Sequence, residues 1–505
     1  MEKEIFISET SLESKIAILE DKQLVELYIE TPNKYRMISN IYYGKIEKVI
    51  DGIGAAFIAI GEKQNAFLPF SQITKKHGLP RKKERINGAG SPTIEPPIRS
   101  SKDLKEGKYI LVQINKEPYF KKGPGVTTDV SLAGRYSVLV PFSKNIGISK
   151  KIKSRTKRSS LKKMAEELIP DGFGLIIRTE AEDKEIEYIK DDVKKLLNSW
   201  KELEKNVKNA NTAQLVHKEM GTSSSVIRDL FTSEVDRVII DSKSKYKDIK
   251  SYVGDIDEKL LGRIFYHKSG SLFGEYGISK QIEKYLRRKV WLKNSSYLII
   301  EQTEALLSID VNSGRFVGNK NREENILKVN LVAANEIARQ LRLRNNGGLI
   351  VIDFIDLTKA KNKVKLENEL KKELKKDRAV TTVAKLSKFG LLEMTRQRIR
   401  NSLIFSMSDV CPVCHGNGRI PSKQSMISKI EMWIKRFRLH NKAKRVFVHV
   451  HPNLLEYINQ NHRKLFRRIQ WKHLIKISFI EDAEINIGEF KIFMKKNSDE
   501  VTEKY

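Results

Sequence analysis

Two aspartates follow apolar segments at points where a buried strand would end. Ala305-Leu-Leu-Ser-Ile leads into Asp310, and Leu349-Ile-Val-Ile leads into Asp353. Between them, apolar residues recur at spacings of three and four, which predicts a helix over residues 323–344. A strand–helix–strand unit of this length favours parallel neighbouring strands. We therefore expect both carboxylates at the carboxyl end of adjacent strands, about 4.8 Å apart.

Two carboxylates this close repel each other unless a cation lies between them. A cation with oxygen ligands that keeps several waters is typical of Mg²⁺, so Asp310 and Asp353 are candidate Mg²⁺ ligands. Asn312 comes two residues after Asp310 and faces the same side of the strand, where it can orient a carboxylate or a scissile phosphate. The alternative is that each aspartate only caps a turn.

The only two cysteines of the chain, Cys411 and Cys414, have the two-residue spacing that lets both thiolates bind one tetrahedral zinc ion. The pair is half of a closed zinc site, so two chains would each have to supply two thiolates. The alternatives are a redox couple and a plain turn. A redox pair usually opens a helix after a strand, whereas glycines follow this pair at once, which disfavours the redox interpretation.

The charge balance indicates a polyanionic partner. Lys and Arg number 95 against 63 Asp and Glu, which leaves a net charge of +32. A basic excess of this size favours nucleic acid over an anionic membrane surface, because no basic helix with an aromatic face stands out. Lys is about twice as frequent as Arg, as expected of an AT-rich genome. No apolar run approaches 18 residues, so we expect no membrane span.

The length of 505 residues and the changing hydrophobic pattern along the chain predict several domains of mixed α/β and α+β type. Short alternating strands open the chain, and Gly-interrupted strands that suit a small barrel of the OB type follow up to residue 118. A stretch at 75–102, rich in Lys, Arg, Gly, Pro and Ser, reads as a flexible basic loop. A charged helix should run to about Leu215, an α/β block covers 283–400, and a basic α/β segment ends the chain.

Long motifs then make a family recognisable. The segments that start at Ile300, Ala333, Gly347, Phe389 and Cys411 closely resemble the ribonuclease E/G family, and the similarity runs from the first strand to about Ile420. The resemblance implies these domains: an RNase H-like domain (1–35 and 216–282), an S1-like OB barrel inserted in it (36–118), a 5′-sensor domain (119–215), a DNase I-like catalytic domain (283–402), a zinc-link (403–419) and a small C-terminal α/β domain (420–505).

The resemblance also implies an activity and its residues. It implies an Mg²⁺-dependent, single-strand-specific endoribonuclease that leaves 5′-monophosphate ends, acts in rRNA and mRNA processing and decay, and forms a homodimer or homotetramer through a shared zinc ion. The implied residues are Asp310, Asp353 and Asn312 for catalysis, Cys411 and Cys414 for zinc, Phe57, Phe67 and Lys116 for RNA, and Gly123, Arg178 and Thr179 for a 5′-monophosphate. The barrel strands taken alone would instead place both phenylalanines in the barrel core.

Two departures from the family pattern are visible. Val380 stands where the family usually has Arg or Lys after Asp-Arg-Ala, which weakens the expected 5′-end sensing, and the insertion at 75–102 is long. The alternative function is a catalytically inactive RNA-binding or assembly protein of the same fold, and a DNA nuclease is a further rival. We expect the stroma of a plastid whose own AT-rich genome encodes the chain, or otherwise a bacterial cytoplasm.

Overall fold

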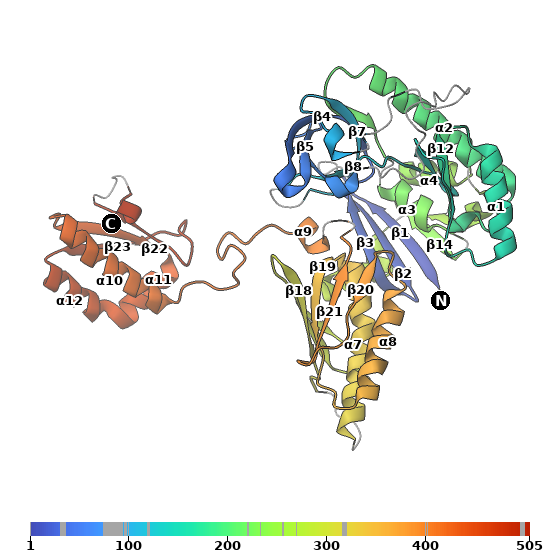
Figure 1. The fold of residues 1–505 in the computed structure, drawn as a ribbon. Helices are drawn as coiled ribbons and strands as arrows, with labels where there is room; N and C mark the ends of the chain where they lie inside the picture. Colours follow the sequence, from blue (N-terminus) through green and yellow to red (C-terminus); the bar gives the residue numbers. More distant parts are fainter. Residues whose placement is uncertain are drawn as a thin grey trace. The chain divides into compact units, whose positions relative to one another are not determined.

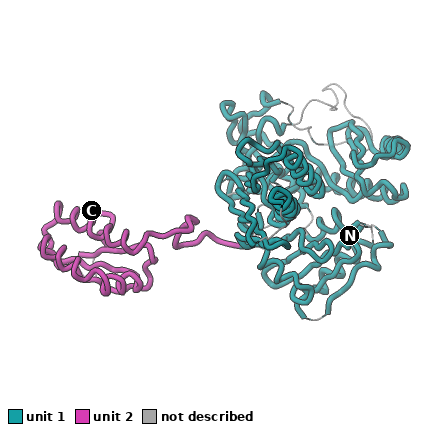
Figure 2. Tube along the Cα trace, turned by 90° about the horizontal axis from the view of Figure 1, so that it is seen from below, with its two compact units in different colours: residues 1–407 teal, residues 408–505 magenta. Residues whose placement is uncertain are grey.

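The chain folds into two compact units, residues 1–407 and residues 408–505, which Figure 2 colours separately. The computed structural model describes residues 2–30, 37–73, 94, 98, 100–118, 122–219, 222–232, 234–254, 257–268, 270–315, 321–398, 400, 402–494 and 500–504. Most of the insertion at 75–102 lies outside these residues. The described residues of the first unit form four sheets and those of the second form one, which agrees with the multidomain α/β prediction.

The first sheet joins two distant segments of the chain. Three antiparallel strands from the start of the chain pair with two parallel strands from residues 237–266, in the order β15-β14-β1-β2-β3. The strands are β1 Lys3–Glu9, β2 Ser14–Glu20, β3 Gln23–Glu30, β14 Arg237–Ile240 and β15 Ile264–Tyr266. The helices of this part are α3 Thr222–Leu230, α4 Lys243–Gly254, α5 Leu272–Glu275, α6 Ile278–Tyr285 and a 3-10 segment, Glu258–Arg263.

The second sheet closes into a five-stranded barrel, as the OB prediction requires (Figure 1). The strands pair in the order β4-β5-β6-β8-β7, and β7 pairs back with β4. They are β4 Ile41–Ile50, β5 Ala55–Ala59, β6 Ala66–Pro69, β7 Tyr109–Lys116 and β8 Gly125–Thr127. The 3-10 segments are Asp51–Ile53, Phe70–Gln72 and Ser101–Asp103. The closing strand β8 lies beyond the predicted boundary at 118. The prediction missed it because three residues after a Gly-rich loop carry almost no periodic signal.

The third sheet positions Arg178 and Thr179, two of the predicted 5′-phosphate residues, which directly follow its strand β12. Its order is β11-β12-β10-β9, and its core centres on Trp200, which packs edge-on against Phe142 and Phe173. The elements are β9 Leu132–Ala133, β10 Ser137–Pro141, β11 Ile146–Ile148, α1 Arg155–Leu168, β12 Phe173–Ile177, the 3-10 segment Thr179–Ala181 and α2 Ile186–Lys208. The helix α2 ends seven residues before Leu215, which lies instead in β13 Gln214–His217, a strand paired with the barrel.

The fourth sheet has the order β16-β17-β18-β19-β21-β20. Its strands and helices are β16 Lys289–Trp291, β17 Tyr297–Gln302, β18 Leu306–Asn312, α7 Arg322–Arg344, β19 Gly348–Asp353, α8 Ala360–Leu374, β20 Thr381–Val383, β21 Leu391–Arg396 and α9 Leu403–Met407. Among the described strands of this sheet, β18 and β19 form the one parallel pair, and α7 lies between them in the sequence. The Asn321 side chain caps α7, and Asn345 ends it in the left-handed conformation, so the predicted helix over 323–344 is confirmed.

The second unit is a small α/β fold. A three-stranded sheet of order β23-β22-β24 combines a parallel and an antiparallel pair, and Trp433 and Phe437 of α10 lie in its core. The elements are α10 Lys423–His440, β22 Arg445–Val450, α11 Pro452–Tyr457, the π-helical segment Ile458–His462, α12 Arg463–His473, β23 Lys476–Glu481, β24 Phe490–Phe493 and the 3-10 segment Thr502–Lys504. Over the described residues of the chain, no helix combines the length and apolarity needed to cross a bilayer.

Candidate active site and nucleic-acid interface

The parallel pair β18 and β19 brings Asp310 and Asp353 together. The strand register makes them direct partners, so the predicted adjacency of the two residues is confirmed. Inward-facing Ile309 and Val311 flank Asp310 and are buried, whereas both aspartates are exposed at the sheet surface. Their carboxylates therefore share one solvent-facing end of the two strands, the end where such sheets place ligands.

The surroundings of the pair concentrate negative charge. Asn312 donates a hydrogen bond from Nδ2 to Oδ2 of Asp310 at 2.7 Å, which fixes the orientation of that carboxylate. Partial burial, and then the charges of Asp310 and Asp356, raise the pKa of Asp353. Among the described residues, no three His, Cys, Asp or Glu side chains converge tightly enough to hold a metal ion. The donor set is thus two carboxylates and an amide, which suits an ion that keeps several waters, as Mg²⁺ does.

The loop after β19 is held by α7, a feature that the sequence did not indicate. Asn330 of α7 is fully buried, donates to the carbonyl oxygen of Ile355 at 2.7 Å and accepts from its N–H at 3.1 Å. The Glu323 carboxylate in the first turn of α7 accepts hydrogen bonds from Thr358 and from the N–H of Lys359. The helix therefore fixes the backbone that carries Asp353.

The predicted RNA-binding residues lie in one row across the barrel. The strand register places five residues side by side, each the direct partner of the next across neighbouring strands. In order they are Lys48 on β4, Phe57 on β5, Phe67 on β6, Gly125 on β8 and Lys116 on β7. We call these five residues the barrel row. The two phenyl rings meet edge to face with centroids 5.8 Å apart.

The placement of both phenylalanines in the barrel core, expected from the strands alone, is wrong. Each phenylalanine is half-buried, whereas the residues next to them along the two strands, Ala56, Ile58 and Leu68, point inward and fill the barrel. The barrel row therefore presents two aromatic rings between two exposed lysines. This combination suits a single strand, because any base can stack on a ring while cations contact the phosphates.

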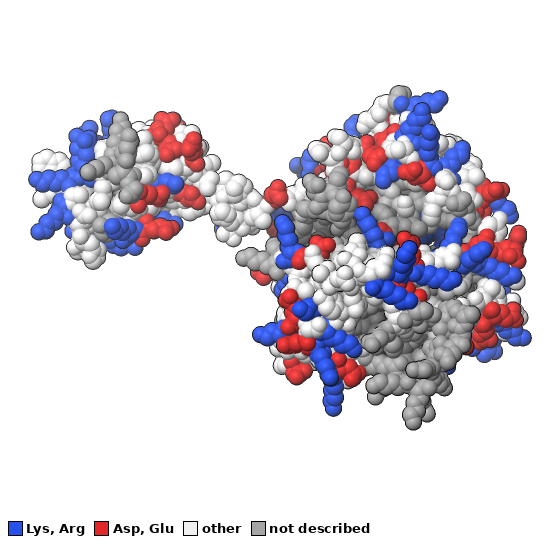
Figure 3. All heavy atoms as spheres, turned by 90° about the horizontal axis from the view of Figure 1, so that it is seen from above, with Lys and Arg blue, Asp and Glu red and all other residues white. Residues whose placement is uncertain are grey.

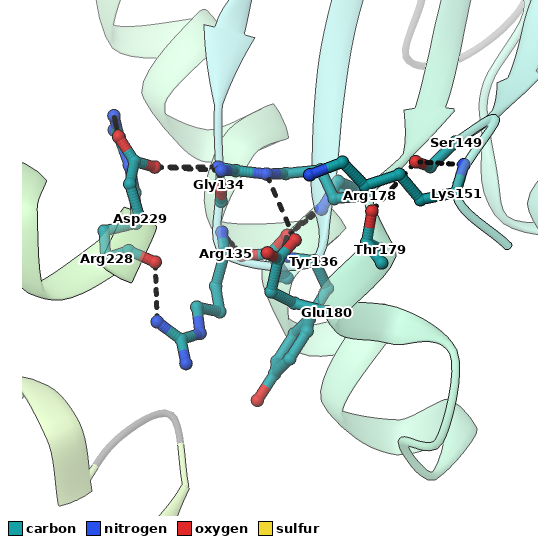
Figure 4. A network of polar contacts seen from close by, with 12 residues as sticks. Gly134, Arg135, Tyr136, Ser149, Lys151, Arg178, Thr179, Glu180, Arg228 and Asp229 are labelled. Carbon is teal, nitrogen blue, oxygen red and sulfur yellow. Dashed lines mark hydrogen bonds and ion pairs between the residues drawn. The ribbon is translucent and has the colours of Figure 1, made fainter. Parts of the chain in front are cut away.

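Arg178 and Thr179, two of the three predicted 5′-phosphate residues, lie in a site that already contains carboxylates (Figure 4). Arg178 donates from both terminal nitrogens to Oδ1 of Asp229 at 3.0 Å, and its Nε lies 3.7 Å from Oε2 of Glu180. Burial alone would raise the pKa of Asp229, but Arg228 and Arg178 outweigh it and lower that pKa. Asp229 is therefore an anion, and the charge of Arg178 is shared.

The other residues of that predicted pocket are distributed differently. Thr179 exchanges a hydrogen bond with Ser149 at 2.8 Å, beside Arg178 (Figure 4). Gly123 packs in the barrel, where a Cβ would clash with the carbonyl oxygen of Asn65. Val380 is 68% exposed and carries no charge. Glu180 was missed from the sequence, because nothing in its local pattern shows which cation it faces.

The cysteine pair lies in a turn before α10. Cys411 is exposed and Cys414 half-buried, and both are free thiols. The turn closes with hydrogen bonds from the N–H of His415 to the carbonyl of Cys411 and from the N–H of Asn417 to that of Cys414. Backbone N–H groups of Cys414 and Val413, and the Cys414 side chain, lower the pKa of Cys411 and favour its thiolate. Two thiolates without a further ligand among the described residues leave half of a zinc site.

Comparisons with known proteins match nearly the whole chain. Residues 131–399 match the model of the "Ribonuclease E/G family", and residues 410–497 match that of an "RNase E/G, Thioredoxin-like domain". The chain is 33% identical to ribonuclease G of Salmonella typhimurium over 90% of its own length and 92% of that protein. It is 34% identical to ribonuclease E of Haemophilus influenzae, of which it spans 53%.

A plant protein is also similar. The chain is 40% identical to a "Ribonuclease E/G-like protein, chloroplastic" of Arabidopsis thaliana. The alignment covers 67% of this chain and 36% of that protein. The thioredoxin-like name refines the predicted small α/β domain. In that domain the cysteine pair precedes α10 and the first strand, β22, so it does not lie between a strand and a helix as in a redox motif.

Proposed function

Since this chain belongs to the ribonuclease E/G family, we propose that it is an endoribonuclease that cleaves single-stranded RNA and leaves 5′-monophosphate ends. The reaction would require Mg²⁺ and would take place at Asp310 and Asp353. The observation that supports this most strongly is the pairing of these two aspartates across parallel strands. Processing and decay of rRNA and mRNA are the corresponding cellular roles.

Asp310 and Asp353 are the residues that would hold the ion. A bound divalent cation supplies Lewis-acid stabilisation of negative charge at the attacked phosphate. Asn312 keeps the Asp310 carboxylate in one orientation, and Asn330 keeps the loop beyond Asp353 in place. The side chains around the site are thus ordered before RNA arrives, which favours a rigid reaction geometry.

The barrel row would hold the RNA. Phe57 and Phe67 offer stacking surfaces, and Lys48 and Lys116 offer cations at the two ends of the row. Lys48 extends the set expected from the sequence. Stacking on rings requires unpaired bases, which supports a preference for single strands.

The zinc-dependent assembly and the 5′ pocket are also part of the proposal. Cys411 and Cys414 of two chains would share one zinc ion in a homodimer or in pairs within a homotetramer. Arg178 and Thr179 would contact a 5′-monophosphate with modest selectivity, because Asp229 and Glu180 compete for the arginine. A plastid stroma or a bacterial cytoplasm is the proposed compartment, and the chloroplastic name of the 40% identical relative supports the former.

A cleavage assay tests the proposal against its two rivals. A short AU-rich single-stranded RNA is incubated with the full chain in Mg²⁺ or in EDTA, next to a DNA oligonucleotide of matched sequence. We expect cleavage of the RNA in Mg²⁺ alone, with 5′-monophosphate products. RNA binding without cleavage would favour the inactive RNA-binding or assembly protein, and equal cleavage of the DNA would favour a DNA nuclease.

A further inference from the structure

The second unit carries a basic helix face whose role the proposed cleavage site does not explain. Helix α12, Arg463–His473, has five Lys and Arg among its 11 residues and no acidic residue. Its buried side chains, Phe466 and Ile469, point into the core of the unit. Its exposed side chains fall in two rows at a spacing of four, which we call the α12 face: Arg463, Arg467 and Trp471, and Lys464, Arg468 and Lys472.

The charges of the α12 face are not neutralised locally. In the described part of the chain, none of its five cations forms an ion pair or a side-chain hydrogen bond. The neighbouring helix α10 adds Arg438 and Lys435 near His473 at the end of α12, and Lys435 is paired there with Glu431 at 2.8 Å. In Figure 3 the basic side chains of residues 408–505 gather on one side and most of the acidic ones on the other. Such a concentration of positive charge attracts a polyanion.

An exposed aromatic ring lies at the C-terminal end of these cations. Trp471 is 83% exposed and lies one helical turn after Arg467 and Arg468, next to Lys472 in the sequence. Exposing so large an apolar side chain costs solvation free energy, and Trp471 adds nothing to the buried core of the unit. An exposed indole flanked by arginines matches the way proteins bind single strands, in which a base stacks on the ring and the cations contact phosphates.

We propose that the α12 face is a second binding surface for single-stranded RNA, separate from the barrel row. It extends the proposed function, since RNA is the polymer that both surfaces would hold. An anionic membrane is less suitable, because the apolar side of α12 is buried in the core, and only Trp471 and the capping residue Leu474 are exposed apolar side chains among described residues 463–474. A symmetric contact with a second copy is also disfavoured, because it would bring two strongly positive faces together.

The test measures RNA binding of the full chain with an Asp353→Asn background, so that the RNA stays intact. Affinity for a fluorescent 30-nucleotide single-stranded RNA is measured by anisotropy at several salt concentrations. Trp471→Ala should raise Kd about fivefold or more and leave the salt dependence unchanged. Arg467→Gln with Arg468→Gln should raise Kd and reduce the slope of log K against log salt by about 1.4, or about 0.7 for each lost phosphate contact.

Matched controls remove equivalent groups from α10. Leu439→Ala removes an apolar side chain that is 79% exposed, and Lys423→Gln with Lys429→Gln removes two exposed cations. Both should change Kd less than twofold, and circular dichroism should show every variant folded. RNA binding unchanged by the α12 variants, or lowered equally by the controls, would overturn the proposal.

Two further readouts separate the competing partners from RNA. If the α12 variants lose flotation with phosphatidylserine vesicles while RNA affinity is unchanged, the face binds membranes and the proposal is wrong. If they change the mass of the protein in sedimentation but not its RNA affinity, the face is an interface between copies, which also contradicts it. Because binding is measured without cleavage, failure of the nuclease assay would not alter these outcomes.

Discussion

At the scale of single residues, the geometry separates the side chains proposed to hold RNA from those that fill the barrel. Alternation along β5 and β6 points Ala56, Ile58 and Leu68 inward and leaves Phe57 and Phe67 on the outer surface. The sequence shows this alternation, but it does not show which of the two alternating sets of side chains faces the interior of the barrel. That choice depends on the closure of the barrel with β8, whose three residues gave no signal.

Phe57→Ala should therefore weaken RNA binding without unfolding the barrel. Loss of one stacked base costs about 1–3 kcal/mol of binding free energy. Anisotropy with a short single-stranded RNA measures the change, and circular dichroism checks the fold. Phe265→Ala, which truncates a 48% exposed phenylalanine of another sheet, is the matched control and should leave affinity unchanged. An unaltered affinity in folded Phe57→Ala would remove Phe57 from the interface.

The carboxylates around Arg178 predict weak selection of 5′ ends. Val380 lacks the expected cation, and Glu180 and Asp229 share the charge of Arg178, so we expect at most about a tenfold preference, or about 1.4 kcal/mol, for 5′-monophosphate over 5′-hydroxyl RNA. Glu180→Ala should increase that preference about twofold to fivefold, as loss of a partly exposed ion pair predicts. Rates for the two substrates measure it, with Glu182→Ala as the control. A preference that falls in Glu180→Ala would mean that Arg178 does not contact the phosphate.

At the scale of elements, ion pairs connect the first sheet to the part of the chain that carries Asp310 and Asp353. Glu26 of β3 accepts from Arg342 of α7 at 3.2 Å and pairs with Arg378 before β20. Burial by itself would raise the pKa of Glu26, but Arg378 and Arg342 outweigh it and hold the pKa at about 2. The carboxylate is thus charged throughout the neutral range and joins two sheets that lie far apart in the sequence.

This lowered pKa predicts a specific dependence of stability on pH. Because the folded pKa lies below the usual 4.5, the stabilisation is complete above about pH 4.5 and is lost as the pH falls toward 2. Glu26→Gln should lower the free energy of unfolding by about 3 kcal/mol at pH 7 and should flatten its pH dependence between 4.5 and 2. Urea unfolding at several pH values measures both. Glu166→Gln on α1, an exposed pair, should change stability by less than about 0.5 kcal/mol. A variant that keeps the acid transition of the wild type would contradict this account.

The sequence predicted elements where the pattern was long and local, and it failed where a partner was distant. The helix predicted over 323–344 follows from a long periodic pattern and corresponds to the 23 residues of α7, Arg322–Arg344. The parallel pairing of its flanking strands follows from the length of the crossover. By contrast, α2 ends earlier than predicted because Leu215 joins the barrel strand β4. Glu180 beside Arg178, and Asn330 on the backbone of Ile355, are contacts that no local pattern encodes.

At the scale of the whole molecule, the cysteine turn predicts that metal binding and association are linked. Each chain supplies two thiolates and a closed zinc site needs four, so a two-fold axis near Cys411 and Cys414 would complete the site. Native mass spectrometry should find one zinc per two chains. Removal of the metal, or Cys411→Ser, should shift the protein toward monomer and reduce activity. His415→Ala should keep both the zinc and the dimer. A metal-free dimer of unchanged stability, or one zinc in each isolated chain, would leave the pair as a plain turn.

We propose above all that Asp310 and Asp353 form the catalytic site for RNA cleavage. The most direct measurement compares Asp353→Asn with the wild type in two assays, the cleavage rate in saturating Mg²⁺ and the affinity for uncleaved single-stranded RNA. We predict that the rate falls by several orders of magnitude while Kd changes less than about threefold, because the barrel row is untouched. Asp353→Asn cleaving RNA at close to the wild-type rate would contradict the account.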